Sequence, residues 1–146
     1  MSDIRHIGVL TGGGDCPGLN SVIRAVTKTA IIDYNLDVIG FLDGFRGLVE
    51  NNYITLDLKI VSGIAHTGGT ILGTTNRDNP FSFYAAGRYG NEPVDESDRA
   101  INNLGNLGLD GLIVIGGDGS LHIAQQFCQK GVKIVGVPKT IDNDLM

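Results

Sequence analysis

The segment LIVIGGDGS, residues 112–120, decides the fold. Its first four residues, Leu112 to Ile115, form an apolar run that is typical of a strand buried on both faces, as in a parallel sheet. A glycine-rich turn follows at once, and residues 121–130 then have the apolar spacing of a helix. A buried strand that runs through such a turn directly into a helix predicts an α/β protein.

The same pattern recurs along the chain. Strands that alternate with helices predict a mostly parallel sheet covered on both faces, a three-layer helix–sheet–helix sandwich of the Rossmann-like type. The 146 residues fit a single domain, residues 1–146. The other expected strands are Ile4–Leu10, Val38–Leu42, Val132–Val137 and a small one at Tyr53–Leu56; helices are expected at 19–33, 58–65 and 100–107, the last capped by Asp95 or Ser97, and residues 80–94 are expected to be irregular.

Composition excludes several classes of protein. Hydrophobic residues make up 42% of the chain and charged residues 18%, the formal net charge is −5, and the sequence has no dense basic run, so we expect no nucleic-acid partner. No stretch reaches the roughly 18 apolar residues of a membrane span, and the N-terminus lacks the apolar core of a signal peptide. Two cysteines are too few for a disulfide framework, which favours the cytoplasm.

Glycine is unusually frequent, with 22 residues in 146, about twice the usual ~7%. Polar loops, two of them glycine-rich, follow three of the expected strands: TGGGD follows Leu10, GGDGS follows Ile115 and PKTIDND follows Val137. Each loop taken singly is more often an ordinary turn. Because the carboxyl ends of parallel strands share one edge of a sheet, the three loops together predict a common ligand site there.

The chemistry of these loops indicates phosphate binding. Glycines let backbone N–H groups approach an anion, and the N-terminus of the following helix adds a favourable dipole. A carboxylate at Asp118 beside phosphates indicates Mg²⁺, since the metal reverses the repulsion. Asp142 and Asp144 are candidates for a general base and a second electrostatic group in phosphoryl transfer. Neither the Walker pattern GxxxxGK[ST] nor GxGxxG occurs.

Four motifs in this order and spacing resemble the N-terminal half of 6-phosphofructokinases. The resemblance covers nearly the whole chain, and it implies the first domain of such an enzyme, with the C-terminal substrate domain absent from this chain. GGDGS alone is shared with other kinases, whereas PKTIDND together with GGGDCPGLN is much more specific. The motifs are GVLTGGGDCPGLNSVIR (8–24), GGTILGTTNR (68–77), IVIGGDGS (113–120) and PKTIDND (138–144).

The resemblance implies phosphorylation of the 1-hydroxyl of fructose 6-phosphate in glycolysis, with Mg²⁺ as cofactor. It implies that Asp142 is the general base and Asp144 assists, that Thr140 and Ile141 lie against the sugar phosphate, and that Asp118 binds the metal. It places Gly14, Gly117, Gly119 and Ser120 around the donor phosphates. The family usually has an arginine at the position of Asn76; here Arg77 follows one place later and is the candidate phosphate contact.

The family divides between ATP and pyrophosphate as donor, and this sequence has a mixed pattern. Gly119 is the ATP-like choice and Lys139 the pyrophosphate-like one. A carboxylate at position 119 would crowd and repel the α-phosphate of a nucleotide, whereas glycine leaves room. We therefore expect ATP as the donor, with pyrophosphate as the alternative.

The resemblance also bears on assembly and activity. Family members are more than twice as long, so we expect this chain to be a fragment with little turnover alone, whose parent is a homodimer or homotetramer, with effector sites at subunit contacts as is usual in the family. Two other functions stay open: a kinase of the GGDG type that acts on a nucleotide or a lipid, and a non-catalytic nucleotide-binding or regulatory module.

Overall fold

The computed structural model describes residues 3–14, 18–75, 78–84 and 92–139. Their backbone builds one five-stranded sheet in the order β3-β2-β1-β4-β5. Neighbouring strands run parallel except for β2 and β3, which are antiparallel. The strands are β1 (His6–Thr11), β2 (Asp37–Phe41), β3 (Tyr53–Leu56), β4 (Gly111–Gly116) and β5 (Ile134–Pro138).

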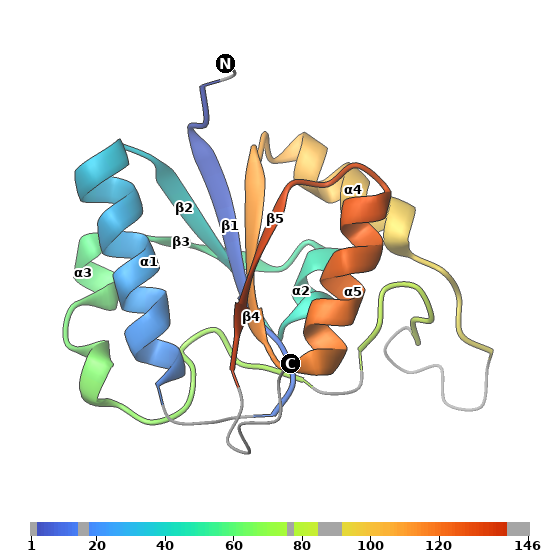
Figure 1. Cartoon of the computed structure of the whole chain (residues 1–146), viewed down its shortest axis with the longest axis horizontal. Coiled ribbons are helices and arrows are strands. Elements are labelled where there is room, and N and C mark those ends of the chain that lie inside the picture. Colours follow the sequence, from blue (N-terminus) through green and yellow to red (C-terminus); the bar gives the residue numbers. More distant parts are fainter. Residues whose placement is uncertain (1–2, 15–17, 76–77, 85–91, 140–146) are drawn as a thin grey trace.

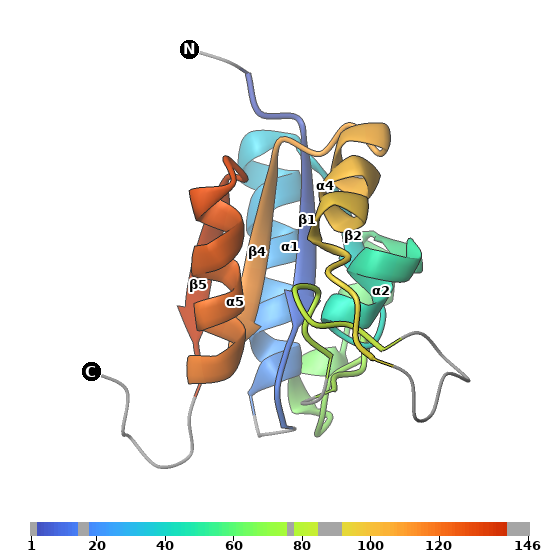
Figure 2. The ribbon, with the colours of Figure 1, turned by 90° about the vertical axis from the view of Figure 1, so that its right-hand side faces the viewer.

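Helices cover both faces of this sheet, as predicted. In Figure 1, α1 and α3 lie to the left of the sheet, and α2, α4 and α5 lie to its right. Figure 2 shows the second group from its own side, with α2 and α4 beside each other and α5 next to β4 and β5. The helices are α1 (Leu19–Tyr34), α2 (Phe45–Glu50), α3 (Leu58–Val61), the 3-10 helix η1 (Ile64–His66), α4 (Ser97–Asn106) and α5 (Asp118–Gln129).

Alternation along the strands divides the core into two halves. In β4, Leu112 and Val114 pack toward α2, α4 and α5, whereas Ile115 packs toward α1 and α3. This is the period of two that a strand dictates, and here both sets are buried because both faces carry helices. The buried apolar run of residues 112–115 is therefore explained by its central place in the sheet.

The strand register brings the carboxyl ends of three strands level with one another. Thr11 of β1 lies opposite Ile115 of β4, and Gly116 of β4 lies opposite Pro138 of β5. All three strands run in the same direction, so the segments that follow them leave from one edge, the lower edge in Figure 1. The described beginnings of the three loops that the sequence singles out lie at this edge.

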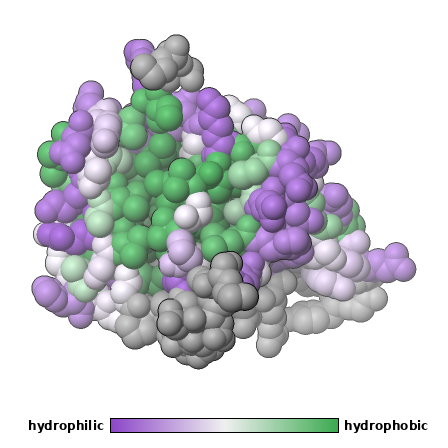
Figure 3. Space-filling view, in the orientation of Figure 1, coloured by the Kyte–Doolittle hydropathy of each residue, from purple (hydrophilic) through white to green (hydrophobic). Residues whose placement is uncertain are grey.

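The outer end of the sheet is less covered on the side of α1. The side chain of Val135 in the edge strand β5 is 63% exposed. Figure 3, drawn in the orientation of Figure 1, shows a broad hydrophobic area in the centre of the view, between α1 and α5. Among the described residues, no helix has both the length and the apolar character needed to cross a membrane.

The structure differs from the sequence expectations in local detail. Strand boundaries shift by one or two residues. The helix α2 was not predicted, because six residues are too few to show a helical period. The cap of α4 was predicted wrongly: the N-cap is Glu96, not Asp95 or Ser97. Asp95, one residue earlier, braces the start of the helix, because its Oδ1 accepts hydrogen bonds from the Ser97 N–H (2.9 Å) and the Ser97 hydroxyl (2.6 Å).

Candidate functional site

The three loops begin side by side at the lower edge of the sheet. The N–H of Gly12 donates to the Ile115 carbonyl (2.8 Å), and the N–H of Lys139 donates to the Gly116 carbonyl (2.9 Å). A β-carbon on Gly13 would lie 3.9 Å from the Lys139 Nζ. The described beginnings of TGGGD, GGDGS and PKTIDND thus meet in space, as the parallel topology predicted.

The first two loops are packed too closely for side chains between them. Ser120, in the first turn of α5 and only 8% exposed, lies where a β-carbon on Gly12 or on Gly116 would be. Glycine at both positions lets the helix N-terminus approach the ends of β1 and β4. Close approach of a helix N-terminus to two strand ends is what a phosphate cradle requires.

A cavity of about 370 Å³ opens at this edge. Its volume lies in the usual range for small-molecule sites of roughly 300–1,000 Å³. Residues from both glycine-rich loops, from α2, from α5 and from positions 75, 78 and 79 surround it. The lining residues are Gly13, Phe45, Thr75, Asp78, Asn79, Gly117, Gly119, Ser120 and Ile123.

The hydrogen bonds at this edge show which backbone amides are available to an anion. The N–H of Gly12 donates to Ile115 and that of Gly13 donates to Thr75 (3.0 Å). The first bond within α5 runs from Leu121 to Gly117, and the N-cap Gly117 has no side chain that caps the helix. The amides of residues 118–120 make no hydrogen bond to a described residue. The helix therefore offers the anion-binding amides, with a dipole of the right sign.

The segment 67–75 is held against α1 and β1. Asn20, only 2% exposed, donates to the Thr67 carbonyl (3.2 Å) and accepts from the Ile71 N–H (2.8 Å). The hydroxyl of Thr11 donates to the Gly73 carbonyl (2.8 Å). These contacts make the segment a fixed wall of the edge.

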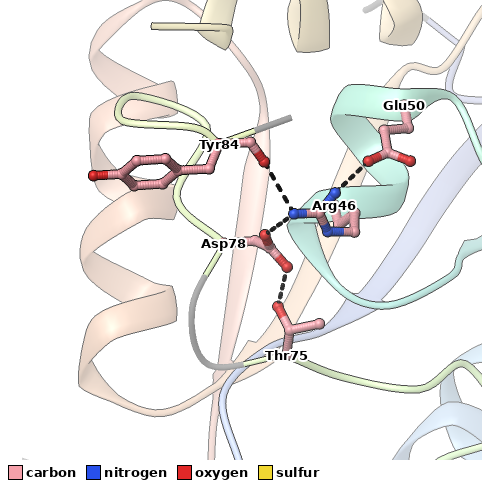
Figure 4. Close-up of polar contacts among 5 residues, drawn as sticks. All are labelled: Arg46, Glu50, Thr75, Asp78 and Tyr84. Carbon is pink, nitrogen blue, oxygen red and sulfur yellow. Dashed lines mark hydrogen bonds and ion pairs between the residues drawn. The ribbon is translucent and has the colours of Figure 1, made fainter. Parts of the chain in front are cut away.

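An ion pair continues this wall to α2 (Figure 4). Arg46 donates to Asp78 Oδ1 (2.7 Å) and to the Tyr84 carbonyl (3.1 Å), and it also pairs with Glu50. The hydrogen bond to Asp78 is the main reason why the pKa of Arg46 is raised above its ordinary value. Asp78 Oδ2 accepts from the Thr75 hydroxyl (2.5 Å), so both carboxylate oxygens of Asp78 are engaged.

Comparison with known proteins agrees with this geometry. The family model described as Phosphofructokinase matches residues 6–146. The chain belongs to the phosphofructokinase family. The fold and the resemblance that the four motifs predicted are thereby confirmed.

Relatives within the phosphofructokinase family carry both donor names. An ATP-dependent 6-phosphofructokinase 2 of Clostridium perfringens is 54% identical over 147 residues, covering 100% of this chain and 40% of that protein. A pyrophosphate--fructose 6-phosphate 1-phosphotransferase of Streptomyces coelicolor is 47% identical over 140 residues, 95% of this chain and 38% of that protein. The crystal structure of Pichia pastoris phosphofructokinase in the T-state matches with a TM-score of 0.83 at 31% identity, over 100% of this chain and 16% of that chain. The chain spans about two fifths of the length of these bacterial relatives.

The structure places some of the predicted site residues at the cavity and leaves others outside its description. Gly117, Gly119 and Ser120 line the cavity, Gly14 and Asp118 are exposed at the same edge, and Lys139 is half-buried beside Gly13. A β-carbon on Gly14 or on Gly119 would meet no atom of the described residues within 4 Å beyond the local backbone. The remaining candidates, Asn76, Arg77, Thr140, Ile141, Asp142 and Asp144, lie outside the described residues.

The residues that sequence reasoning missed come from α2 and the segment after Gly73. Phe45, Thr75, Asp78 and Asn79 line the cavity, although none belongs to the three loops TGGGD, GGDGS and PKTIDND. A signal was present, because Phe45 follows the end of β2, and β2 runs parallel to β1 and ends at the same edge. Applying the strand-end argument to this fourth strand would have found Phe45.

The donor set at this edge fits Mg²⁺ only in part. Asp118 offers one exposed carboxylate in the first turn of α5, and the described residues contain no group of three side chains that could hold a metal. Mg²⁺ is commonly held by one or two carboxylates together with substrate phosphates, so this sparse set is compatible with a metal that arrives with its phosphate ligand.

Proposed function

We propose that this chain is the donor-binding part of an ATP-dependent 6-phosphofructokinase. The observation that carries the proposal is the cavity formed by Gly13, Gly117, Gly119 and Ser120 beside the uncapped N-terminus of α5. Membership in the phosphofructokinase family and the names of its relatives support it. The reaction is transfer of the γ-phosphoryl group of ATP to the 1-hydroxyl of fructose 6-phosphate, a step of glycolysis.

The roles of the residues follow from the resemblance and from the edge geometry. The amides of α5 and the glycine loops bind the donor phosphates, with Asn76 or Arg77 as a further contact. Asp118 holds Mg²⁺, which neutralises phosphate charge when it is bound. Asp142 accepts the proton of the attacking hydroxyl, Asp144 supports the charge change, and Thr140 and Ile141 orient the sugar phosphate.

ATP is favoured over pyrophosphate by the space around Gly119. Among the described residues, no atom outside the local backbone lies within 4 Å of a β-carbon at this position, which lines the cavity. A nucleotide has an α-phosphate and a nucleoside to place, so open space next to the phosphate cradle favours it. Pyrophosphate is the second candidate, because the half-buried Lys139 places its ammonium group beside Gly13 and some relatives bear a pyrophosphate name.

The proposed parent protein is longer than this chain. We propose that residues 1–146 form the donor-binding domain, that a further domain completes the sugar phosphate site, and that the parent is a cytoplasmic homo-oligomer with effector sites at its subunit contacts. The relatives, of which this chain spans about two fifths, support a longer parent.

Donor titrations of the 146-residue chain test the proposal. We expect Mg-ATP to bind, as measured by isothermal titration calorimetry, and we expect little phosphorylation of fructose 6-phosphate, as measured by release of ADP. Absence of Mg-ATP binding contradicts the donor assignment. Phosphorylation of a nucleoside or a lipid in place of the sugar by the complete protein favours a different GGDG-type kinase, and donor binding without any turnover favours a regulatory module.

A further inference from the structure

Asp78 is a carboxylate in the wall of a cavity that is suited to anions. Its side chain is only 9% exposed, and it lines the same cavity as Gly117 and Gly119. A bare carboxylate at this place would repel a phosphate. Arg46 compensates this negative charge, because its guanidinium forms an ion pair with Asp78 Oδ1 at 2.7 Å.

The other oxygen of Asp78 connects the pair to the first glycine loop. The Thr75 hydroxyl donates to Asp78 Oδ2 (2.5 Å), while the Thr75 carbonyl accepts from the Gly13 N–H (3.0 Å). The neighbouring Thr74 hydroxyl donates to the Gly13 carbonyl (2.5 Å). Both sides of the Gly13 residue are thus held by Thr74 and Thr75, and Asp78 accepts from the hydroxyl of Thr75.

Arg46 is itself fixed in place by several partners. It spans from Glu50 in its own helix to Asp78 and the Tyr84 carbonyl, and its guanidinium lies 4.9 Å from the centre of the buried Phe83 ring. A planar guanidinium supplies these directed contacts at once, which a lysine cannot do. Figure 4 shows Arg46 between the helix on one side and Asp78 and Tyr84 on the other.

We propose that Arg46 is a positioning residue of the donor site, which holds Gly13 in place through Asp78 and Thr75 and neutralises Asp78 beside the bound anion. The expected effect on donor binding rests on the proposed function. The expected effect on Gly13 is independent of the proposed function, because it concerns hydrogen bonds within the ligand-free chain.

A ligand-free experiment tests the connection to Gly13. Amide hydrogen exchange is measured by NMR for Gly13 and, as an internal reference for global stability, for Val114 in the core strand β4. In Arg46→Gln and Asp78→Ala we expect Gly13 to exchange at least about tenfold faster relative to Val114, as local opening predicts. A ratio within about twofold of the wild type in both variants overturns the proposal.

Two control variants separate this role from general support of α2. Glu50→Gln removes the other carboxylate partner of Arg46, on the helix surface. Asn103→Ala removes the side chain that donates to the Leu48 and Val49 carbonyls (2.8 and 2.9 Å) at the far end of α2. Both are expected to leave the Gly13 ratio unchanged. An equal change in Asn103→Ala shows that loosening α2 suffices, and this overturns a specific role for Arg46.

Donor binding then separates positioning from charge alone. Calorimetric titration with Mg-ATP and with Mg-pyrophosphate is carried out on variants with wild-type circular dichroism. If charge alone matters, Asp78→Ala binds anions more tightly, because a negative charge is lost. If positioning matters, it binds roughly three- to tenfold more weakly, the scale of effects passed through a chain of contacts. Tighter binding overturns the positioning role. A wild-type chain that binds neither donor overturns the proposed function and the donor part of this inference, while the exchange ratio still decides the Gly13 part.

Discussion

The hydroxyl of Ser120 occupies the space in which a side chain on Gly12 would lie. This contact joins the end of β1 to the first turn of α5, and it explains why glycine follows the first strand directly. Because a side chain at position 12 would disturb this contact, the free energy of unfolding of a Gly12 variant reports how closely the two loops approach.

Gly12→Ala is expected to destabilise the chain by about 1–3 kcal/mol, the usual cost of overpacking. The reason is that the new methyl group would overlap the Ser120 hydroxyl and lie 3.0 Å from its Cβ, so α5 must shift. Urea unfolding followed by circular dichroism measures the change. Gly14→Ala is the matched control, since its methyl group meets no atom of the part of the chain that the structure describes within 4 Å, beyond its neighbours, and we expect a change below roughly 0.5 kcal/mol. If the double variant Gly12→Ala/Ser120→Gly regains part of the lost free energy of unfolding, the overlap with Ser120 is the cause. Equal stability of Gly12→Ala and Gly14→Ala contradicts this explanation.

Asp95→Ala is expected to lower stability at neutral pH by about 1 kcal/mol, the usual net contribution of a hydrogen bond, because its carboxylate accepts two hydrogen bonds from the first residue of α4. Hydrogen bonds from the hydroxyl and the N–H of Ser97 hold the pKa of Asp95 below its ordinary value. Because the folded pKa is lowered, this stabilisation is fully present above the unfolded pKa of about 3.9 and is lost as the pH falls through the folded value. Unfolding free energies of both proteins between about pH 2.5 and 7 are compared, and a difference independent of pH over that range contradicts the assignment.

Asn20→Ala is expected to cost about 1–3 kcal/mol, because the buried Asn20 side chain loses its part-buried hydrogen bonds to the segment 67–71. The side chain both donates to carbonyls of Thr67 and Gly68 and accepts from the Ile71 N–H. Ser21→Ala, which removes one exposed hydrogen bond to the Ala65 carbonyl, is the neighbouring control and should stay within roughly 0.5 kcal/mol. Thermal unfolding ranks the two variants.

Asn20→Asp tests the orientation of the Asn20 amide through the pH dependence of stability. The new carboxylate keeps the acceptor for Ile71 but faces the Thr67 and Gly68 carbonyls, to which the amide now donates. Its folded pKa is therefore raised, so the variant should gain stability relative to wild type as the pH falls, opposite in sign to the Asp95 effect. A loss of relative stability on acidification would show that the amide does not lie as described.

The sequence predicts the parts of this fold that depend on local patterns. The apolar run at 112–115 indicates a buried parallel strand, and parallel strands place the loops after Leu10, Ile115 and Val137 at one edge; the described residues lie there. Glycines also mark the close approach correctly, although the partner, Ser120, is visible only in the structure.

The sequence does not predict contacts that depend on distant segments. Arg46 and Asp78 are 32 residues apart, and neither belongs to a periodic pattern, so nothing local pairs them. The use of the Gly12 and Gly13 amides by backbone carbonyls was likewise not predicted. A glycine-rich loop alone does not show whether its N–H groups face a ligand or a neighbouring strand, because that depends on the packing of the segment that contains Thr75.

Gly119→Asp is the variant that tests the donor choice. Position 119 lies in the first turn of α5, and the described residues leave space for a side chain there. The helix dipole stabilises a negative charge at this end, and replacing glycine lowers the entropy of the unfolded chain, so Gly119→Asp should be slightly more stable than the wild type. Under the proposed donor assignment, the same carboxylate would lie near the α-phosphate of a bound nucleotide, and like charges brought together cost several kcal/mol. We therefore expect the affinity for Mg-ATP to fall by more than about tenfold relative to that for Mg-pyrophosphate.

Two further variants isolate the charge at this position. Gly119→Asn introduces a side chain of nearly the same size without the charge, and Gly105→Asp places the charge in open space on α4, away from the cavity. The ratio of the two dissociation constants, measured by calorimetry, should change strongly only in Gly119→Asp. A similar change in Gly119→Asn assigns the effect to size. An unchanged ratio in Gly119→Asp means that the room at this position does not select the donor, and the selection then rests on Lys139.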